Sequence, residues 1–186
     1  MPPINDAAPV RETIDESKEF IAVRIAVVTI SDTRAAADDR SGDTLVTLLS
    51  EAGHILAARD WVRDEKASIT ARLRDWIADP AIDVVIATGG TGVTGRDVTP
   101  EAFSELYDKE IPGFGEVFRL LSWQKIGSSA IQSRATAGVA GGTYLFALPG
   151  SPSACRDGWE GILRWQLDSR HPPCNFVSLM PRLLEK

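Results

Sequence analysis

Residues 83–101, which read DVVIATGGTGVTGRDVTPE, constrain the fold of this chain more than any other stretch. Residues 84–87 form a short apolar run without alternation, which is typical of a strand buried on both faces of a parallel sheet. Glycines follow at positions 89, 90, 92 and 95, and Thr99-Pro100 then indicates an N-cap and a first helical residue. Glycine backbones can point successive N–H groups at an anion, and parallel sheets bind ligands at the carboxyl ends of their strands. The stretch therefore predicts a strand, a phosphate-sized loop and a helix.

Two nucleotide-binding motifs match this loop in part, and neither fits it. The spacing Gly90-x-Gly92-x-x-Gly95 matches the dinucleotide fingerprint, but that motif needs its third glycine inside the helix, and the helix predicted here begins later. The order Gly95-Arg96-Asp97 departs from a Walker A loop, where Lys precedes Ser or Thr. The interpretation that the glycines only make a sharp turn is disfavoured by their number.

Two aspartates are candidates for binding a metal ion. An aspartate at the mouth of an anion-binding loop repels phosphate unless a cation lies between them, so Asp97 indicates a metal bridge. Asp64 follows the strand predicted at residues 54–62. From the residues alone, Asp64 fits the capping of the next helix equally well.

The remaining pattern predicts an α/β fold. Strands are expected at residues 20–30, 54–62, 84–87, 135–140 and 143–148, and the last two flank Gly141-Gly142, a tight hairpin signal. Helices are expected at residues 43–52, in the segment that ends at Pro80, and at 100–107, 116–124, 128–134 and 152–167. Ser41 and Gly53 are the expected caps of the first helix, and Ser151 caps the last. The prediction is a three-layer sandwich with a mostly parallel sheet, one antiparallel hairpin and helices on both faces.

Length and composition favour one domain. Residues 1–18 are expected to be a flexible N-terminal arm, 19–176 a single domain and 177–186 a C-terminal tail. The net charge of -6 and pI near 5.0 argue against a nucleic-acid surface. No apolar run approaches the ~20 residues of a membrane span, and the first residues show no signal pattern, so a cytoplasmic location is expected. Cys155 and Cys174 lack metal-ligand spacing.

Several motifs in this order give the chain a family resemblance. They are Ser31-Asp32, Ser41-Gly42, Asp64-Glu65, Thr88-Gly89-Gly90-Thr91-Gly92, Arg96-Asp97-Val98-Thr99-Pro100-Glu101, Pro112-Gly113-Phe114-Gly115-Glu116, Ser133-Arg134 and Leu148-Pro149-Gly150-Ser151-Pro152. Across about residues 21–176 the chain resembles the molybdopterin adenylyltransferases of the MoaB and MogA type. The segments Gln132-Ser133-Arg134-Ala135 and Pro173-Cys174-Asn175-Phe176 are more similar to MoaB.

The resemblance implies molybdenum cofactor biosynthesis, with Mg²⁺-dependent transfer of AMP from ATP to the terminal phosphate of molybdopterin. It implies that Asp64 and Asp97 are catalytic and bind the metal. The residues that it assigns to the nucleotide phosphates are Thr88, Gly89, Gly90, Thr91 and Gly92, with the amides of the glycines as donors. Those that it assigns to the pterin are Ser31, Asp32, Thr99, Pro100, Ser151 and Pro152. The implied partners are further copies of the chain in a trimer or hexamer and other proteins of the pathway. A non-catalytic molybdopterin-binding or scaffold protein of the same fold is the alternative.

Overall fold

The computed structural model describes residues 12–32 and 38–185. Its first half contains β1 (Arg24–Ile30), α1 (Arg40–Glu51), β2 (Ile55–Val62), α2 (Lys66–Ile77), β3 (Val84–Thr88), α3 (Thr99–Ser104) and β4 (Lys109–Glu110). The second half contains α4 (Pro112–Ile126), the 3₁₀ segment η3 (Gly127–Gln132), β5 (Thr136–Ala140), β6 (Thr143–Leu148), α5 (Pro152–Gly158), the π-helical turn η4 (Trp159–Leu163), α6 (Arg164–Gln166), α7 (Phe176–Leu179) and η5 (Met180–Arg182).

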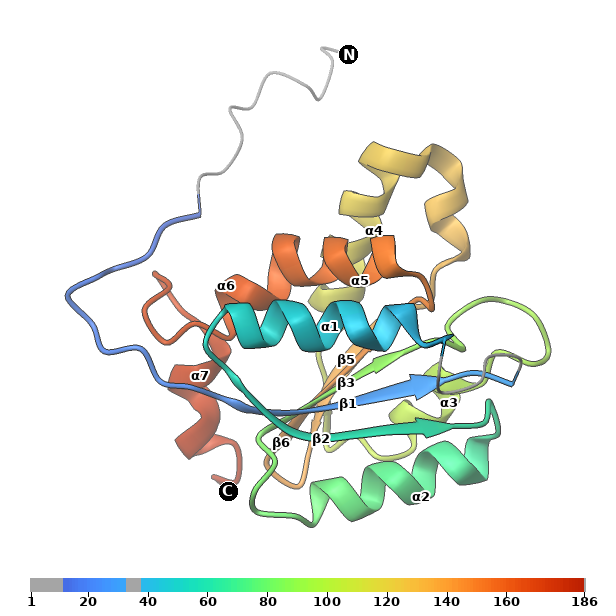
Figure 1. Cartoon of the computed structure of the whole chain (residues 1–186), viewed down its shortest axis with the longest axis horizontal. Coiled ribbons are helices and arrows are strands. Elements are labelled where there is room, and N and C mark those ends of the chain that lie inside the picture. Colours follow the sequence, from blue (N-terminus) through green and yellow to red (C-terminus); the bar gives the residue numbers. More distant parts are fainter. Residues whose placement is uncertain (1–11, 33–37, 186) are drawn as a thin grey trace.

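The strands form one sheet in the order β2-β1-β3-β6-β5-β4. β1 pairs in parallel with both β2 and β3, and β3 pairs in parallel with β6. β5 is antiparallel to β6, and the two-residue strand β4, which the sequence did not predict, is antiparallel to β5. The predicted fold class is confirmed. Because β1, β3 and β6 run in the same direction, the loops that follow them meet at one edge of the sheet (Figure 1).

Helices cover both faces of this sheet. In Figure 1, α1, α4, α5 and α6 lie above it, and α2 and α3 lie below. The strands supply alternate side chains to two apolar cores: Val27 and Ile86 face α1, α4 and α5, whereas Val28 and Val85 face α2 and α3. Side chains of adjacent residues point to opposite faces of a strand, so a strand buried on both sides is apolar throughout.

Local chemistry sets the ends of several elements. Gly141 and Gly142 have φ of 58° and 87°, as a two-residue hairpin turn with positive φ at both positions requires, so that prediction is confirmed. Helix α1 begins at Arg40, because the Asp39 carboxylate accepts the Gly42 N–H at 2.9 Å. The predicted Ser41 cap is therefore wrong.

Two further helix starts differ from the sequence prediction. Helix α4 begins at Pro112 rather than near residue 116, because proline is tolerated in the first turn, where its missing N–H has no partner to lose. Thr99 is the first residue of α3, and its N-cap is Val98, so Thr99 is not the cap. The prediction for Ser151 is confirmed, since its hydroxyl accepts the Ala154 N–H at 3.2 Å at the start of α5.

The C-terminal segment packs on the sheet. Phe176 lies 4.8 Å from Tyr144 and 5.7 Å from Phe146 between ring centroids, and the Tyr144 hydroxyl donates to the Phe176 carbonyl at 3.2 Å. Val177 is buried in the core that faces α1 and α4. Residues 176 and 177 therefore complete that core, which places the expected start of the tail inside the folded unit.

The expected N-terminal arm falls partly outside the described residues, which begin at Glu12. From there the chain contacts the segment after α6: the Asp15 N–H donates to the Arg170 carbonyl at 3.1 Å, and the His171 ring donates to the Thr13 carbonyl at 3.0 Å.

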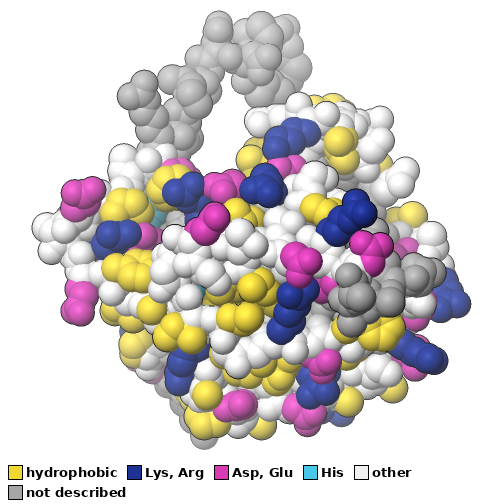
Figure 2. All heavy atoms as spheres, in the orientation of Figure 1, with side chains coloured by type: hydrophobic (Ala, Val, Ile, Leu, Met, Phe, Trp, Pro, Cys, Tyr) yellow, Lys and Arg dark blue, Asp and Glu magenta, His cyan; other side chains and the backbone are white. Residues whose placement is uncertain are grey.

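Two features of the whole molecule concern its surroundings. In the part of the chain that the structure describes, no helix is long and apolar enough to cross a membrane. On the face shown in Figure 2, basic side chains lie singly among acidic ones.

Candidate active site

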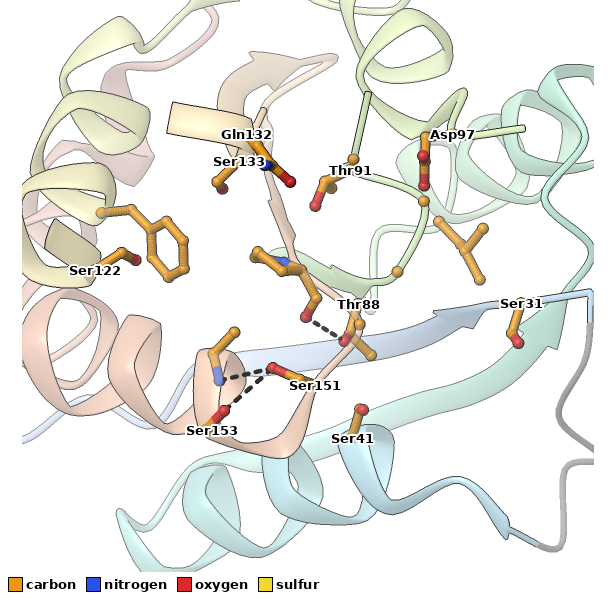
Figure 3. A pocket seen from close by; sticks show the side chains of 18 of the residues that line it. Ser31, Ser41, Thr88, Thr91, Asp97, Ser122, Gln132, Ser133, Ser151 and Ser153 are labelled. Carbon is orange, nitrogen blue, oxygen red and sulfur yellow. Dashed lines mark hydrogen bonds between the residues drawn. The ribbon is translucent and has the colours of Figure 1, made fainter. Parts of the chain in front are cut away.

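A cavity of about 960 Å³ lies at the edge of the sheet where β1, β3 and β6 end. Its walls come from the loops after these strands, the first turn of α1, and the facing sides of α4, η3 and α5. Hydroxyl side chains from most of these elements point into the same space (Figure 3). The Ser and Thr residues that line the cavity are Thr29, Ser31, Ser41, Thr88, Thr91, Ser122, Ser129, Ser133, Ser151 and Ser153. The lining suits a ligand that is rich in hydrogen-bonding groups.

The glycine loop starts at β3 with a close approach between backbones. Gly89 has φ of 112°, and a Cβ there would lie 2.0 Å from the Ile30 carbonyl, so only glycine fits. Its N–H donates to the Leu148 carbonyl at 2.9 Å. We expected this amide to bind phosphate, but it is already engaged in holding the end of β6.

Asp64 lies against the loop at Gly90. A Cβ on Gly90 would lie 2.7 Å from Asp64 Oδ2, and Asp64 Oδ1 accepts the Val98 N–H at 3.3 Å. The N-cap of α2 is Glu65, whose side chain makes no capping bond to the helix backbone, so the helix-cap interpretation of Asp64 is wrong. Burial and the nearby charges of Asp97 and Asp32 raise the pKa of Asp64, against the opposing effect of the Val98 amide.

Asp97 lies against the same loop at Gly92. A Cβ on Gly92 would lie 2.8 Å from Asp97 Oδ2, and this oxygen also accepts the N–H of Thr94 at 2.9 Å and its hydroxyl at 2.6 Å. Burial acts to raise the pKa of Asp97, but the bonds from Thr94 and the Gly92 amide and the charge of Arg134 lower it overall. The two carboxylates thus differ, with Asp97 the more readily ionised.

Asp32 joins the end of β1 to both neighbouring loops. Its carboxylate accepts the Asp64 N–H at 3.1 Å and pairs with Arg96 on the glycine loop. The Arg96 guanidinium lowers the pKa of Asp32. Asp32 and Arg96 both line the cavity, so this ion pair lies where a charged ligand would enter.

The other predicted site residues divide into two groups. Ser31, Thr88, Gly89, Gly90, Thr91, Gly92 and Ser151 line the cavity together with Asp32, Asp64 and Asp97. Thr99, Pro100 and Pro152 do not. The buried Thr99 hydroxyl donates to the Gly89 carbonyl at 2.9 Å and supports the loop from behind, whereas Pro100 and Pro152 lie in the first turns of α3 and α5.

Sequence reasoning missed the wall formed by α4 and α5. Lys125 and Asp157 form an ion pair between these helices, and Ser122 and Gln132 extend the same wall. Their signal was weak because a polar residue on an amphipathic helix usually faces solvent. The Ser41 hydroxyl was also missed as a site residue: its side chain is buried, lines the cavity and has no hydrogen-bond partner among the described residues.

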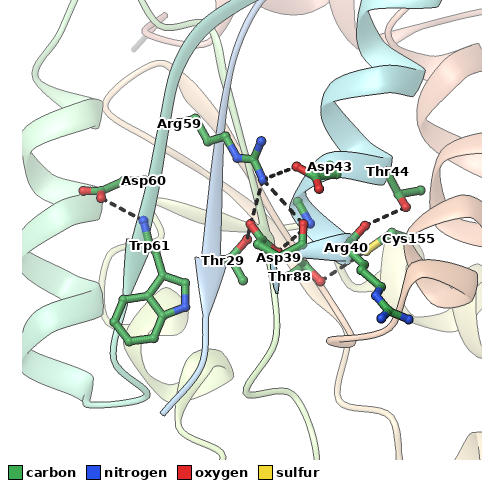
Figure 4. Close-up of polar contacts among 11 residues, drawn as sticks. Thr29, Asp39, Arg40, Asp43, Thr44, Arg59, Asp60, Trp61, Thr88 and Cys155 are labelled. Carbon is green, nitrogen blue, oxygen red and sulfur yellow. Dashed lines mark hydrogen bonds and ion pairs between the residues drawn. The ribbon is translucent and has the colours of Figure 1, made fainter. Parts of the chain in front are cut away.

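A buried carboxylate fixes the turn that carries Ser41. Asp39 accepts the Thr29 hydroxyl at 2.6 Å, the Gly42 N–H at 2.9 Å and Arg59 Nη2 at 3.0 Å (Figure 4). Burial acts to raise the pKa of Asp39, but these three bonds lower it overall. The Asp39 cluster, defined as Thr29, Asp39, Gly42 and Arg59, ties β1, α1 and β2 together beside the cavity.

A metal ion held by protein alone has no obvious place here. Among residues 12–32 and 38–185, no group of three or more His, Cys, Asp or Glu side chains is arranged to hold one. Two carboxylates beside an anion loop suit Mg²⁺ instead, which commonly binds one or two carboxylates together with substrate phosphates and water.

Comparison with known families and proteins agrees with this geometry. Residues 26–169 match the family described as a probable molybdopterin binding domain. The chain belongs to this family. The matched residues run from β1 to the segment after α6 and so include every wall of the cavity.

Named relatives in this family belong to molybdenum cofactor biosynthesis. The chain is 50% identical to molybdenum cofactor biosynthesis protein B of Escherichia coli K12 over 160 residues, covering 86% of this chain and 94% of that protein. It is 48% identical to the Bacillus subtilis protein of the same name, covering 72% and 79%. A crystal structure of molybdenum cofactor biosynthesis protein B superposes with a TM-score of 0.81 at 40% identity, covering 91% of this chain and all of the other. The chain is therefore a MoaB-type protein of molybdenum cofactor biosynthesis.

Proposed function

We propose that this MoaB-type protein transfers AMP from ATP to the terminal phosphate of molybdopterin. In this reaction a phosphate oxygen of molybdopterin attacks the α-phosphorus of ATP, and the bond to the β-phosphate breaks to release pyrophosphate. Atoms and charge balance without a covalent enzyme intermediate. Such transfers depend on positioning and on neutralising charge more than on a protein nucleophile.

The observation that carries the proposal is the pair of carboxylates at the glycine loop. Asp64 and Asp97 lie against Gly90 and Gly92, inside a cavity whose volume is at the upper end of those that hold a single ligand. A cavity of that size suits two substrates side by side. The amides of Gly90 and Thr91 would contact phosphate, since those of Gly92 and Thr94 already donate to Asp97. The hydroxyl-rich walls would contact the ribose and the pterin.

The residues present fit a magnesium ion. Asp64 and Asp97 would hold it together with ATP phosphates, and bound Mg²⁺ would neutralise charge on those phosphates. Without a bridging cation, two carboxylates beside the loop repel ATP. The Asp97 side chain also orders the loop through Thr94, so its position is set before substrate binds.

The test is a direct assay of purified protein with molybdopterin, ATP and Mg²⁺ for the adenylylated product. We expect Asp97→Asn to lower turnover at least about 100-fold, because metal-assisted stabilisation contributes several kcal/mol. Its stability should change little, since asparagine retains an acceptor for Thr94. Asp75→Asn is the control, because Asp75 is exposed on α2 and does not line the cavity. Unchanged turnover in Asp97→Asn contradicts the assignment.

A non-catalytic molybdopterin-binding protein is the second candidate. It is favoured by the neutralising ion pairs Asp32–Arg96 and Lys125–Asp157, which a cavity for an uncharged pterin ring would tolerate. Calorimetric titration of ATP with and without Mg²⁺ separates the two functions. Tight ATP binding that needs Mg²⁺ supports the transferase, and absence of ATP binding supports the second candidate.

We also propose that the chain assembles into a trimer or hexamer, with other proteins of the pathway as partners. The candidate contact is the apolar α4 face, defined as Val117, Leu120, Trp123, Ile126 and Ile131, all of which are exposed. Leu120 and Trp123 are 60% and 58% exposed. Several exposed apolar side chains on one helix and the segment after it are a candidate for an interaction site.

A further inference from the structure

We propose that Arg134 is the positioning residue that holds the glycine loop and Asp97 for catalysis. Arg134 lies in the short segment between η3 and β5. It does not line the main cavity. Its backbone N–H donates to the Thr91 carbonyl at 2.9 Å. Its side chain donates from Nε to the Gly92 carbonyl at 2.6 Å and from Nη2 to the Asp97 carbonyl at 2.7 Å, and it pairs with Glu101.

The loop needs such an external support. Glycines at positions 90, 92 and 95 leave its backbone with many accessible conformations, and residues 93–96 are exposed. In the described chain, the other polar tie between residues 91–97 and a neighbouring element is the ion pair of Arg96 with Asp32. Arg96 is 74% exposed, so that pair is largely screened by water.

The contacts of Arg134 are suited to fixing a geometry. A guanidinium is planar, stays charged and presents its donors in a rigid fork, so bonds to Gly92 and Asp97 hold two points of the loop at a set distance. Gly92 and Asp97 lie at opposite ends of the bend in the loop. The Arg134 side chain therefore fixes both ends. The positive charge also lowers the pKa of the Asp97 carboxyl. A lysine would keep the charge and lose the fork.

Pairing with Glu101 keeps the guanidinium in place. Glu101 lies in the first turn of α3, directly after the loop. Arg134 therefore connects the loop, α3 and the start of β5, and a shift of any one of them would move the Asp97 backbone. The role acts through Asp97, so it rests on the proposed function.

The experiment compares Arg134→Ala and Arg134→Lys with the wild type. Arg134→Ala should lower kcat and raise the Mg²⁺ concentration for half-maximal rate, each by about 10-fold to 100-fold, as loss of a supporting contact around a metal ligand commonly does. Arg134→Lys should lie between the two. Guanidinium chloride supplies the group that Arg134→Ala lacks, so at concentrations far below those that unfold the protein it should restore part of the rate. Sodium chloride at the same concentration is the salt control.

Glu101→Gln is the matched control. It removes the ion pair but leaves the two side-chain bonds from Arg134 to the loop, so a smaller loss than in Arg134→Ala is expected. Wild-type kcat and Mg²⁺ dependence in Arg134→Ala overturn the inference. So does a loss that guanidinium leaves unchanged and that accompanies a lowered Tm, because that pattern indicates general destabilisation.

Amide hydrogen exchange separates this inference from the proposed function. If the wild type forms no adenylylated product, the proposed function fails, and the exchange of residues 90–97 then decides the positioning claim. Faster exchange confined to that segment in Arg134→Ala supports it, and unchanged exchange overturns it.

Discussion

At the residue scale, the polar groups of the site differ in whether they have hydrogen-bond partners within the protein. Asp39, Asp97 and Thr99 have their hydrogen bonds made within the protein. Among the described residues the Ser41 hydroxyl has no hydrogen-bond partner, although its residue is 1% exposed. A buried polar group without a partner costs about 1 to 3 kcal/mol. A ligand that reaches Ser41 would recover part of that cost.

The first prediction concerns Ser41→Ala. Removing an unpartnered hydroxyl should leave the free energy of unfolding unchanged or raise it by up to about 1 kcal/mol. Affinity for the ligand that contacts this wall should fall about 10-fold, which corresponds to one lost hydrogen bond. Thermal unfolding and calorimetry with ATP and with molybdopterin measure the two effects. A loss of stability without a loss of affinity for either ligand would contradict a binding role.

The second prediction concerns the cap of α5. Ser151→Ala should lower the free energy of unfolding by about 1 kcal/mol, because the Ala154 N–H loses its acceptor. Ser153→Ala is the control, since its hydroxyl lies in the same turn but does not cap the helix. Chemical denaturation monitors both variants, and equal stabilities would show that the cap is dispensable.

At the element scale, the agreement between sequence and structure depends on how local each signal is. The strand at residues 84–88, the Gly141-Gly142 turn and the Ser151 cap depend on neighbouring residues and were predictable. The start of α1 was not, because Asp39 and Ser41 are both good caps and the choice depends on Thr29 and Arg59, which are distant in sequence. The glycine loop was predictable as part of the cavity lining because its residues are neighbours in the sequence, whereas the contribution of Lys125 and Gln132 depends on how α4 packs.

The third prediction tests the Asp39 cluster through pH. The folded pKa of Asp39 is lowered, so its ionised form stabilises the fold above the ordinary pKa of an aspartate, and this stabilisation is lost as the pH falls through the folded value. Asp39→Asn should therefore cost about 2 kcal/mol near pH 7. The difference from the wild type should shrink as the pH is lowered below about 4.

Asp43→Asn is the control for that experiment, because Asp43 also pairs with Arg59 but is exposed. Urea unfolding at several pH values provides the measurement. A difference between Asp39→Asn and the wild type that stays constant with pH would mean that the charge of Asp39 does not contribute.

At the scale of the whole molecule, the two faces of the sheet contribute different parts of the site. The face covered by α1, α4 and α5 carries the cavity walls, whereas the face covered by α2 and α3 supports the strands and the back of the glycine loop. Helix α4 contributes both to the cavity and to the outer surface. Ser122 and Lys125 line the cavity, whereas Leu120 and Trp123 are exposed to solvent. Assembly through the α4 face would therefore brace one wall of the site.

The fourth prediction follows from that arrangement. Leu120→Asp should shift the mass in solution toward the monomer, because a charge in an apolar contact has no partner. Ile55→Asp is the control, as Ile55 is also exposed and apolar but lies on the edge strand β2. Light scattering measures the mass, and an unchanged assembly in Leu120→Asp would exclude this helix from the contact.

The packing of Phe176 against Tyr144 and Phe146 affects how the protein can be made in a cell. The core above the sheet contains Val27 from the first strand and Val177 from near the end of the domain. A ribosome synthesises about 5 to 20 residues each second and releases the chain from its N-terminus. This layer stays open to other molecules until residue 177 has emerged, even though β1 to β6 are already outside. Newly made chains thus expose Tyr144 and Phe146 for a short time, and during that interval a chaperone could bind them.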